Sequence, residues 1–314
     1  MRVGLMFPIS ADPAEVVTFA REAETLGFDF LGCGEHLFFH GPVTNAFVSL
    51  AAAAAVTDRI RLLSALTILP VYPAVLAAKQ AATLDRISGG RLDLGIGVGG
   101  EYPPEFEAAG VPVAGRGRRT DESLRVVQEL FAGGPVELEG ETVRLRGLSL
   151  DPPPLQAGGP PLWIGGRKEA ALRRTARFGD VWFPYAVTPE QLQAGMGRLG
   201  ELLDEQGRPQ GAARGAFFGW GHVARSGALA RETAVRVVSS IYQQDFAPLA
   251  DRLLVIGSPA QVVDRLGAYA AAGAEEFLFA PAADDVASLR ETVQLFATEV
   301  LPQVRSLGPR GAST

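Results

Sequence analysis

Polar side chains and glycines follow several short apolar runs, the position where an α/β protein places its chemistry. Glu35-His36 follows the apolar run at residues 28–33, and Glu101 follows the glycine-rich segment at residues 95–100. Histidine suits proton transfer or a hydrogen bond to a cofactor, and a flanking carboxylate can fix its tautomer. We therefore predict His36, Glu101 and Glu35 as catalytic residues. The other interpretation of Glu35-His36 is a pair that caps a loop.

The glycine-rich segment at residues 95–100 is a candidate contact for a planar ring. Glycine has no side chain, so the backbone at Gly97, Val98 and Gly99 can approach a ligand closely. The pattern superficially resembles a dinucleotide-binding loop, but the third glycine and the downstream acid do not follow in register. The alternative is a tight turn without a ligand.

A second glycine pair, Gly165-Gly166, precedes Arg167 and a predicted helix at residues 168–178. Free N–H groups and the positive end of the helix dipole favour an anion at such a position. We predict a phosphate contact at Gly165, Gly166 and Arg167, against the alternative of an ordinary strand-to-helix turn. Arg116, Arg118 and Arg119 form a basic cluster that suggests a solvated face or a contact with an acidic cofactor tail.

Composition and charge exclude several classes of function. The 314 residues carry a net charge of −6, which argues against a nucleic-acid or anionic-membrane partner. Cys33 is the only cysteine, so no intrachain disulfide forms, and the three histidines lack metal-ligand spacing. The longest apolar run, residues 50–56, is too short to span a bilayer. We expect a soluble, cytoplasmic protein without a metal site.

Short apolar runs alternate with longer helical ones, the pattern of a parallel sheet with helical crossovers. The chain length suits one barrel of about 250 residues with insertions. The sequence therefore predicts a single (β/α)8 TIM-barrel domain over residues 1–314. We expect its strands at residues 3–9, 28–33, 60–69, 92–98, 162–164, 181–184, 216–223 and 276–280.

Several segments lie outside this alternation. Alternating residues on either side of Glu139-Gly140-Glu141 predict an exposed β-hairpin at residues 136–145. Residues 226–256 are the least regular part of the chain, with an inserted helix expected at 231–242. A closing helix at residues 289–300 is expected to stop at Pro302, and the tail at residues 308–314 to fray.

Several strings resemble the luciferase-like monooxygenase superfamily from end to end of the chain. The strongest block runs from Pro73 to Gly99. The strings that carry the resemblance lie before, within and after this block. They are Gly27-Phe28-Asp29-Phe30, Tyr72-Pro73-Ala74-Val75-Leu76-Ala77, Ser88-Gly89-Gly90-Arg91-Leu92, Pro160-Pro161-Leu162-Trp163-Ile164-Gly165-Gly166, Ile256-Gly257-Ser258-Pro259 and Glu299-Val300-Leu301-Pro302.

The resemblance implies a barrel, usually a homodimer, that binds FMN or coenzyme F420 with its ring at the strand mouths. The subgroup that the chain is most similar to uses the deazaflavin F420, with Glu35-His36 and Glu101 at the positions of its acid-base groups. It also implies a non-prolyl cis peptide between Ala65 and Leu66. On this basis Ser64, Ala65, Leu66 and Thr67 are expected to contact the cofactor.

The resemblance favours hydride transfer between F420 and a small organic substrate. The first alternative is an FMN-dependent luciferase-like monooxygenase. A second, of another class, is a non-catalytic barrel paralogue that binds a flavin or lipid. A third is a phosphate-binding lyase on the same fold, which the lack of a lysine or metal cluster at the strand ends disfavours.

Overall fold

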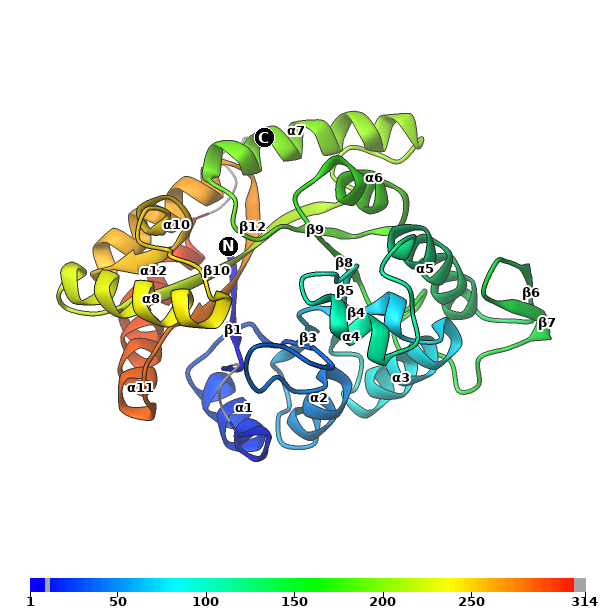
Figure 1. Cartoon of the computed structure of the whole chain (residues 1–314), viewed down its shortest axis with the longest axis horizontal. Coiled ribbons are helices and arrows are strands. Elements are labelled where there is room, and N and C mark those ends of the chain that lie inside the picture. The colour runs from blue at the N-terminus through cyan, green and yellow to red at the C-terminus, as the bar shows by residue number, and fades with distance from the viewer. Residues whose placement is uncertain (9–11, 308–314) are drawn as a thin grey trace.

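The computed structural model describes residues 1–8 and 12–307, in which parallel strands close into a barrel surrounded by helices (Figure 1). Each strand pairs with the next one along the barrel, and the last pairs with the first, so the predicted (β/α)8 fold is confirmed. In order around the barrel the strands are β1 (Arg2–Met6), β2 (Phe30–Cys33), β3 (Arg61–Ser64), β5 (Leu92–Gly97), β8 (Leu162–Gly165), β9 (Val181–Phe183), β10 (Arg214–Val223) and β12 (Ala274–Pro281).

Two of the crossover helices begin at a capping box. Thr188 and Ser258 each form a capping box with the glutamine three residues later, which satisfies backbone groups at the helix start. No helix in the described part of the chain is both long and apolar enough to cross a membrane. The helices are α1 (Val16–Thr25), α2 (Ala46–Ala54), α3 (Ala74–Ile87), α5 (Arg116–Ala132), α6 (Glu169–Phe178), α7 (Pro189–Glu205), α10 (Pro259–Ala271) and α11 (Val286–Leu295).

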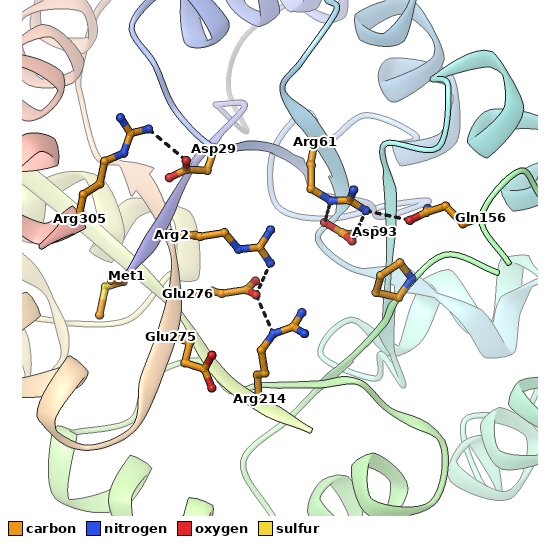
Figure 2. Close-up of a pocket in the computed structure, with 11 residues that line it drawn as sticks. Met1, Arg2, Asp29, Arg61, Asp93, Gln156, Arg214, Glu275, Glu276 and Arg305 are labelled. Atoms are coloured by element: carbon orange, nitrogen blue, oxygen red, sulfur yellow. Dashed lines mark hydrogen bonds and ion pairs between the residues drawn. The ribbon is translucent and has the colours of Figure 1, made fainter. Parts of the chain in front are cut away.

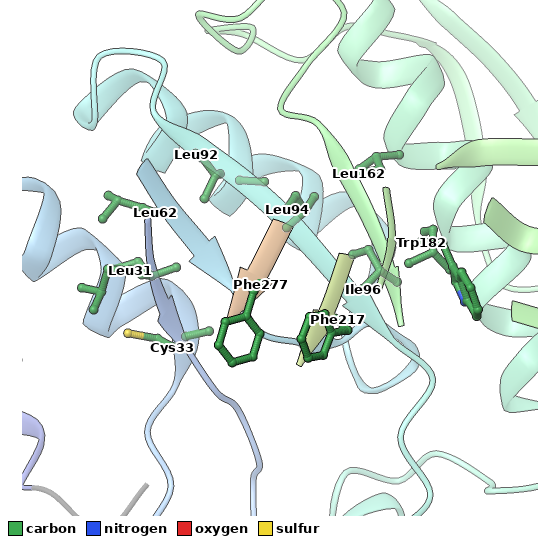
Figure 3. Close-up of a cluster of buried hydrophobic side chains, with 14 of the residues drawn as sticks. Leu31, Cys33, Leu62, Leu92, Leu94, Ile96, Leu162, Trp182, Phe217 and Phe277 are labelled. Carbon is green, nitrogen blue, oxygen red and sulfur yellow. The ribbon is translucent and has the colours of Figure 1, made fainter. Parts of the chain in front are cut away.

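Successive residues of each strand face opposite sides of the barrel wall, which divides the core into two layers. Outward residues such as Leu31, Leu94 and Phe277 pack against the helices (Figure 3). Inward residues such as Phe30 and Trp163 fill the barrel interior, where their rings meet edge to face with centroids 5.4 Å apart. Cys33 is buried in the outer layer, where it packs as a small apolar residue.

The third barrel strand is interrupted, so the prediction of one continuous strand at residues 60–69 is wrong. β3 ends at Ser64, a cis peptide joins Ala65 to Leu66, and a short strand, β4 (Thr67–Ile68), resumes pairing with β5. The cis bond lies at the predicted position, and that prediction is confirmed. The apolar composition of the segment carries no sign of the break.

The segment at residues 226–256 is more regular than its sequence suggests. The helix α8 (Gly227–Tyr242) begins four residues earlier than predicted, because the Ser226 side chain accepts a hydrogen bond from the Leu229 N–H. After α9 (Ala250–Leu253), a strand that we did not predict, β11 (Val255–Gly257), pairs with β10. Three residues are too few to show a strand period.

Three other segments complete the comparison with the sequence. The predicted hairpin is present as β6 (Val136–Glu139) and β7 (Arg144–Leu148), and alternate side chains on one of its faces are buried. Pro302 does not stop the closing helix, which continues through a π turn (Phe296–Val300) into α12 (Leu301–Arg305). Pro302 lies in the first turn of α12, directly after the π turn, and proline is tolerated in a first turn. The tail at residues 308–314 lies outside the described residues.

Candidate active site

The predicted site residues lie at the ends of β3, β5 and β8, in the short strand β4, or on the loops that follow β2, β3, β5 and β8, and therefore at the C-terminal end of the barrel. In TIM barrels this end carries the chemistry, whereas the opposite end serves stability. The loops do not contribute equally. Some of the predicted residues are buried beneath the mouth of the barrel, and others lie partly exposed around it.

His36 forms a hydrogen bond with a carboxylate that the sequence did not single out. Its Nδ1 lies 3.0 Å and 3.2 Å from the two carboxylate oxygens of Glu105, which is buried and also accepts a hydrogen bond from the Leu37 N–H. The His36 ring stacks on Phe39, with centroids 4.3 Å apart. Nδ1 is therefore anchored, and Nε2 has no hydrogen-bond partner among the described residues.

Glu105 lies on α4 (Pro103–Ala108), a short helix that we did not predict. The available signal was the string Pro103-Pro104-Glu105, since proline at the first helical positions followed by an acid marks a helix start. That signal places a helix, but it does not reveal that the acid turns inward to meet His36. The contact joins residues 69 positions apart, and only the fold brings them together.

Glu35 is placed differently from His36, although the two are adjacent in sequence. Its buried carboxylate accepts four hydrogen bonds, from the Tyr72 hydroxyl at 2.9 Å and from the side chain or backbone of Asn45, Ala46 and Ile68. Burial raises the pKa of Glu35, and these hydrogen bonds oppose that effect. Oε2 accepts three of these hydrogen bonds and Oε1 accepts the one from Ile68, so each carboxylate oxygen is held by the chain itself, which suits a positioning role.

Leu66 occupies the space that three glycines leave at the strand ends. A Cβ added to Gly165 would lie 2.1 Å from the Leu66 side chain, and one added to Gly95 would lie 2.6 Å from it. Gly97 is less crowded, at 3.3 Å from the Leu66 Cβ. These glycines therefore make room for a side chain, which is a packing reason for a motif that we had interpreted as a ring contact.

Ser64 is also fully engaged. It is buried, and its hydroxyl donates to the Gly95 carbonyl and accepts from the Gly95 N–H, which ties β3 to β5. We call Glu35, Ser64, Leu66 and Gly165, which are held or packed by the chain itself, the floor. The structure does not leave the Ser64 hydroxyl open to a ligand.

The remaining predicted contacts of the glycine loop lie at or near the surface. Ala65, Val98 and Gly99 are partly exposed, and the Gly99 carbonyl accepts a hydrogen bond from Arg116 Nε at 3.1 Å. Arg119 likewise donates to the Pro70 carbonyl. At least these two arginines of the basic cluster support loops rather than forming a solvated face.

Glu101 pairs with a tyrosine that the sequence did not single out. The Tyr185 hydroxyl, after β9, donates to the Glu101 carboxylate at 2.6 Å, and burial together with that carboxylate raises the pKa of Tyr185. The guanidinium of Arg167 lies over the Tyr185 ring at 5.2 Å and donates to the Ala186 carbonyl. His36, Glu101, Arg167 and Tyr185 form what we call the rim.

Aromatic residues from β10 and the following segment complete the mouth. Trp220 donates from Nε1 to the Tyr242 hydroxyl at 3.1 Å, and the rings of Phe218 and Phe246 contact this pair. His222, at the end of β10, is buried with Nδ1 2.8 Å from the Ala282 carbonyl, and burial lowers its pKa. Sequence reasoning missed these residues because they follow irregular or strongly apolar stretches.

A family model described as luciferase-like monooxygenase matches residues 1–276 of the chain. The chain belongs to the luciferase-like monooxygenase family. The resemblance drawn from the sequence strings is therefore confirmed.

Individual proteins that the chain is similar to carry different names. The chain is 37% identical over 176 residues to an uncharacterized protein of Mycobacterium tuberculosis, Rv0940c; the match covers 56% of this chain and 60% of that protein's length. It is 27% identical to an FMNH2-dependent dimethylsulfone monooxygenase of Pseudomonas putida, over 85% of this chain and 79% of that protein. A solved F420-dependent secondary alcohol dehydrogenase shares the fold, with a TM-score of 0.84 at 20% identity, over 97% of this chain and 99% of the dehydrogenase.

Proposed function

We propose that this protein is an F420-dependent oxidoreductase that moves a hydride between the deazaflavin and a small organic substrate. The observation that carries the proposal is the pair formed by His36 and the buried Glu105 at the C-terminal end of the barrel. A histidine with one nitrogen anchored by a carboxylate and the other open is a group suited to moving protons. The structural relative that uses F420 on an alcohol supports the same chemistry.

The residues at the mouth fit a cofactor with a flat ring and a phosphate. Thr67 has a buried hydroxyl without a hydrogen-bond partner among the described residues, next to the partly exposed Ala65-Leu66 peptide. The α6 N-terminus has no side-chain cap, and Arg167 lies exposed beside it. We propose that the residues at 65–67 and 97–99 hold the ring, and that Gly165, Gly166 and Arg167 hold the phosphate.

F420 supplies hydride chemistry when bound, because carbon replaces the reactive ring nitrogen of a flavin and the reduced ring resists oxygen. The chain then has to accept one proton from the substrate, or donate one in the reverse direction. A substrate alcohol that loses hydride from carbon becomes a carbonyl, and its hydroxyl proton needs a base. Neutral His36 with its Nδ1 proton held by Glu105 presents the lone pair of Nε2 for this proton. In the reverse direction the imidazolium returns it.

The remaining residues of the rim and floor have supporting roles in this proposal. Glu35 holds the loop that carries His36, through its bonds to Ala46 and Ile68. Phe39 stacks on the His36 ring and shields it from water, which strengthens the bond to Glu105. Glu101, paired with Tyr185, offers a second site for a proton near the substrate.

A second candidate function is an FMN-dependent monooxygenase. It is favoured by the dimethylsulfone monooxygenase of Pseudomonas putida, a relative in sequence over most of this chain. The same mouth would then hold reduced FMN, and His36 would manage a proton during oxygen transfer. The two functions differ in whether oxygen is consumed.

We also propose that the protein is a homodimer. Exposed apolar side chains on α2 and α3 support this, since Val48 is 69% exposed and Leu76 is 47% exposed. Exposed apolar surface on adjacent helices favours association. Replacing Val48 with Asp should convert the dimer to monomer in light scattering; a wild-type monomer would rule the proposal out.

Turnover assays with both cofactors test the function directly. Oxidised F420 is mixed with a panel of small secondary alcohols, and reduced F420 with the matching ketones, while the visible absorbance of the deazaflavin is followed. We expect stoichiometric reduction or oxidation without oxygen uptake. Oxygen uptake with reduced FMN, together with no change in deazaflavin absorbance in any F420 reaction, would instead support the monooxygenase.

A further inference from the structure

The N-terminal end of the barrel, opposite the proposed active site, opens into a cavity of about 780 Å³ (Figure 2). Its wall is made by the first residues of the barrel strands, and most of the side chains there are charged. Arg2, Arg61 and Arg214 come from the starts of β1, β3 and β10, and Glu276 comes from the start of β12. Nothing in the proposed hydride transfer uses these groups.

Part of this charge is fully paired and has a structural explanation. Arg61 donates from Nε and Nη2 to the two oxygens of Asp93, at 2.9 Å and 2.8 Å, and also to Gln156 at 3.2 Å. Arg305 bonds to Asp29 at 3.1 Å. Such bidentate and networked pairs hold strand starts together and leave little capacity for a ligand.

Arg2 and Arg214 are paired incompletely. Both donate to the same oxygen of Glu276, Oε1, with Arg214 Nε at 3.1 Å. Figure 2 shows the two guanidinium groups reaching Glu276 from different sides of the cavity. Nε and Nη1 of Arg2, and both Nη atoms of Arg214, have no hydrogen-bond partner in the described part of the chain.

The second oxygen of Glu276 is an unpaired acceptor. The side chain is only 1% exposed, yet Oε2 has no partner among residues 1–8 and 12–307. A buried acceptor without a donor is costly, and native structures rarely leave one unexplained. The cavity thus brings together four donor atoms without a protein partner, on the partly exposed side chains of Arg2 and Arg214, and one acceptor atom that is buried in its wall.

We propose that this cavity binds a hydrogen phosphate group, either free or as a phosphate monoester. The guanidinium groups of Arg2 and Arg214 donate to its ionised oxygens, and its P–OH donates to Oε2 of Glu276. Arginine matches phosphate oxygens through its planar set of donors. A carboxylate acceptor adds selectivity, because only an anion that keeps a proton can satisfy it.

Other small ligands fit this arrangement less well. A metal cation would face two guanidinium groups with a single free carboxylate oxygen as its ligand. A sulfate dianion or a simple carboxylate has no proton for Oε2, so its approach leaves that oxygen unpaired and repelled. The triad of Arg2, Arg214 and Glu276 carries a net charge of +1, which favours an anion overall, although Glu275 at the cavity edge opposes it.

Phosphate and sulfate, compared at matched ionic strength near neutral pH, test the proposal. Binding is followed by thermal shift and by calorimetry on the protein without cofactor. The Arg167→Ala variant serves as the background, because the proposed cofactor phosphate site at the other end also attracts anions. We expect saturable binding of phosphate, with a Kd at least about tenfold lower than that for sulfate.

Variants then locate the site. Arg214→Gln should weaken phosphate binding at least about tenfold, and Glu276→Gln should abolish the preference for phosphate over sulfate, because an amide donor replaces the acceptor. If Glu276→Gln does not fold, Arg2→Gln replaces it and should also lose at least about tenfold in affinity. Equal binding of the two anions by the wild type, or unchanged binding in Arg214→Gln, would overturn the proposal.

Glycerol 3-phosphate, added in the same assay, distinguishes the two sources of the group. Binding comparable to that of inorganic phosphate would identify a phosphorylated organic ligand. Binding of inorganic phosphate alone would identify the free ion. Both results support a hydrogen phosphate site, whereas failure of both ligands to bind would remove it. Neither result depends on the proposed hydride transfer, which takes place at the opposite end of the barrel.

Discussion

The floor and the rim of the barrel mouth differ in how their polar atoms are satisfied. In the floor, Glu35 accepts four hydrogen bonds and Ser64 exchanges two with one backbone residue, so the chain itself holds both carboxylate oxygens of Glu35 and the hydroxyl of Ser64. In the rim, His36 is held by one nitrogen, and Glu101 is held by a single tyrosine hydroxyl. The polar side chains of the rim keep atoms free for a ligand, whereas the polar side chains of the floor, Glu35 and Ser64, are held by the chain.

This difference assigns separate work to residues that are adjacent in the chain. Glu35 and His36 leave β2 together, but one turns into the protein and the other toward the mouth. Substitutions in the floor should therefore lower stability, whereas substitutions in the rim should lower turnover and spare the fold. Each variant below tests that division.

Glu35→Ala should have the largest effect, a loss of at least about 3 kcal/mol in unfolding free energy. It leaves the Ala46 and Ile68 N–H groups and the Tyr72 hydroxyl without their acceptor in a buried site. Glu101→Ala is the matched control, since it also removes a tyrosine partner but at an exposed position, and should cost less than about 1 kcal/mol. Equal losses of unfolding free energy in Glu35→Ala and Glu101→Ala, measured by urea unfolding, would contradict the distinction between floor and rim.

His36→Ala should lower kcat by about 10²-fold, which corresponds to about 2.7 kcal/mol, with little change in melting temperature. Glu105→Gln should give a smaller loss and displace the pH profile, because an amide can still hold Nδ1 but carries no charge. His40→Ala is the control, an exposed histidine in the same loop that should change kcat less than about twofold. Wild-type kcat in both His36→Ala and Glu105→Gln would remove the pair from the mechanism.

Gly165→Ala should destabilise the protein by about 1–3 kcal/mol, because the new Cβ overlaps Leu66 in a packed layer. Adding Leu66→Ala in the same chain should recover part of the loss, as a double-mutant cycle would show. Gly197→Ala, on α7 with open space around its Cβ, is the control and should be neutral or stabilising. A loss in Gly165→Ala that Leu66→Ala does not relieve would contradict this packing account.

The pH dependence of the unfolding free energy should show the smallest effect. It is measured as the difference between the curves of the wild type and of Glu35→Gln. Burial raises the pKa of Glu35, so the folded protein holds this proton more tightly than the unfolded chain. Its contribution to stability is full below the unfolded pKa and declines as pH rises through the raised pKa. Glu35→Gln should remove that decline in urea unfolding at several pH values. Parallel curves for the two proteins would show that Glu35 does not titrate there.

The barrel was predictable because its signals are local and repeated. Apolar runs alternate with helices that start at Thr188 or Ser258, and capping residues announce such starts. The position of the cis bond at Ala65-Leu66 came from the family resemblance alone. The prediction that Pro302 ends the helix was wrong, because proline is also tolerated in the first turn of a helical segment.

The site was less predictable, because its partners are set by the fold. His36 and Glu101 stand out at strand ends, but Glu105 and Tyr185 reach them from distant parts of the chain. The glycines at 95 and 165 were ambiguous for a physical reason, since a missing side chain makes room equally for a ligand or for Leu66. Sequence spacing does not distinguish these two uses.

Side-by-side titration of the protein with F420 and FMN tests the central proposal most directly. Fluorescence quenching of each cofactor gives its Kd, and Arg167→Ala is titrated in parallel. We predict that F420 binds at least about tenfold more tightly than FMN, and that Arg167→Ala weakens F420 by about 1.5–3 kcal/mol through loss of a charge-assisted bond. Tenfold tighter binding of FMN would contradict the assignment of the cofactor, and unchanged F420 affinity in Arg167→Ala would contradict the placement of its phosphate.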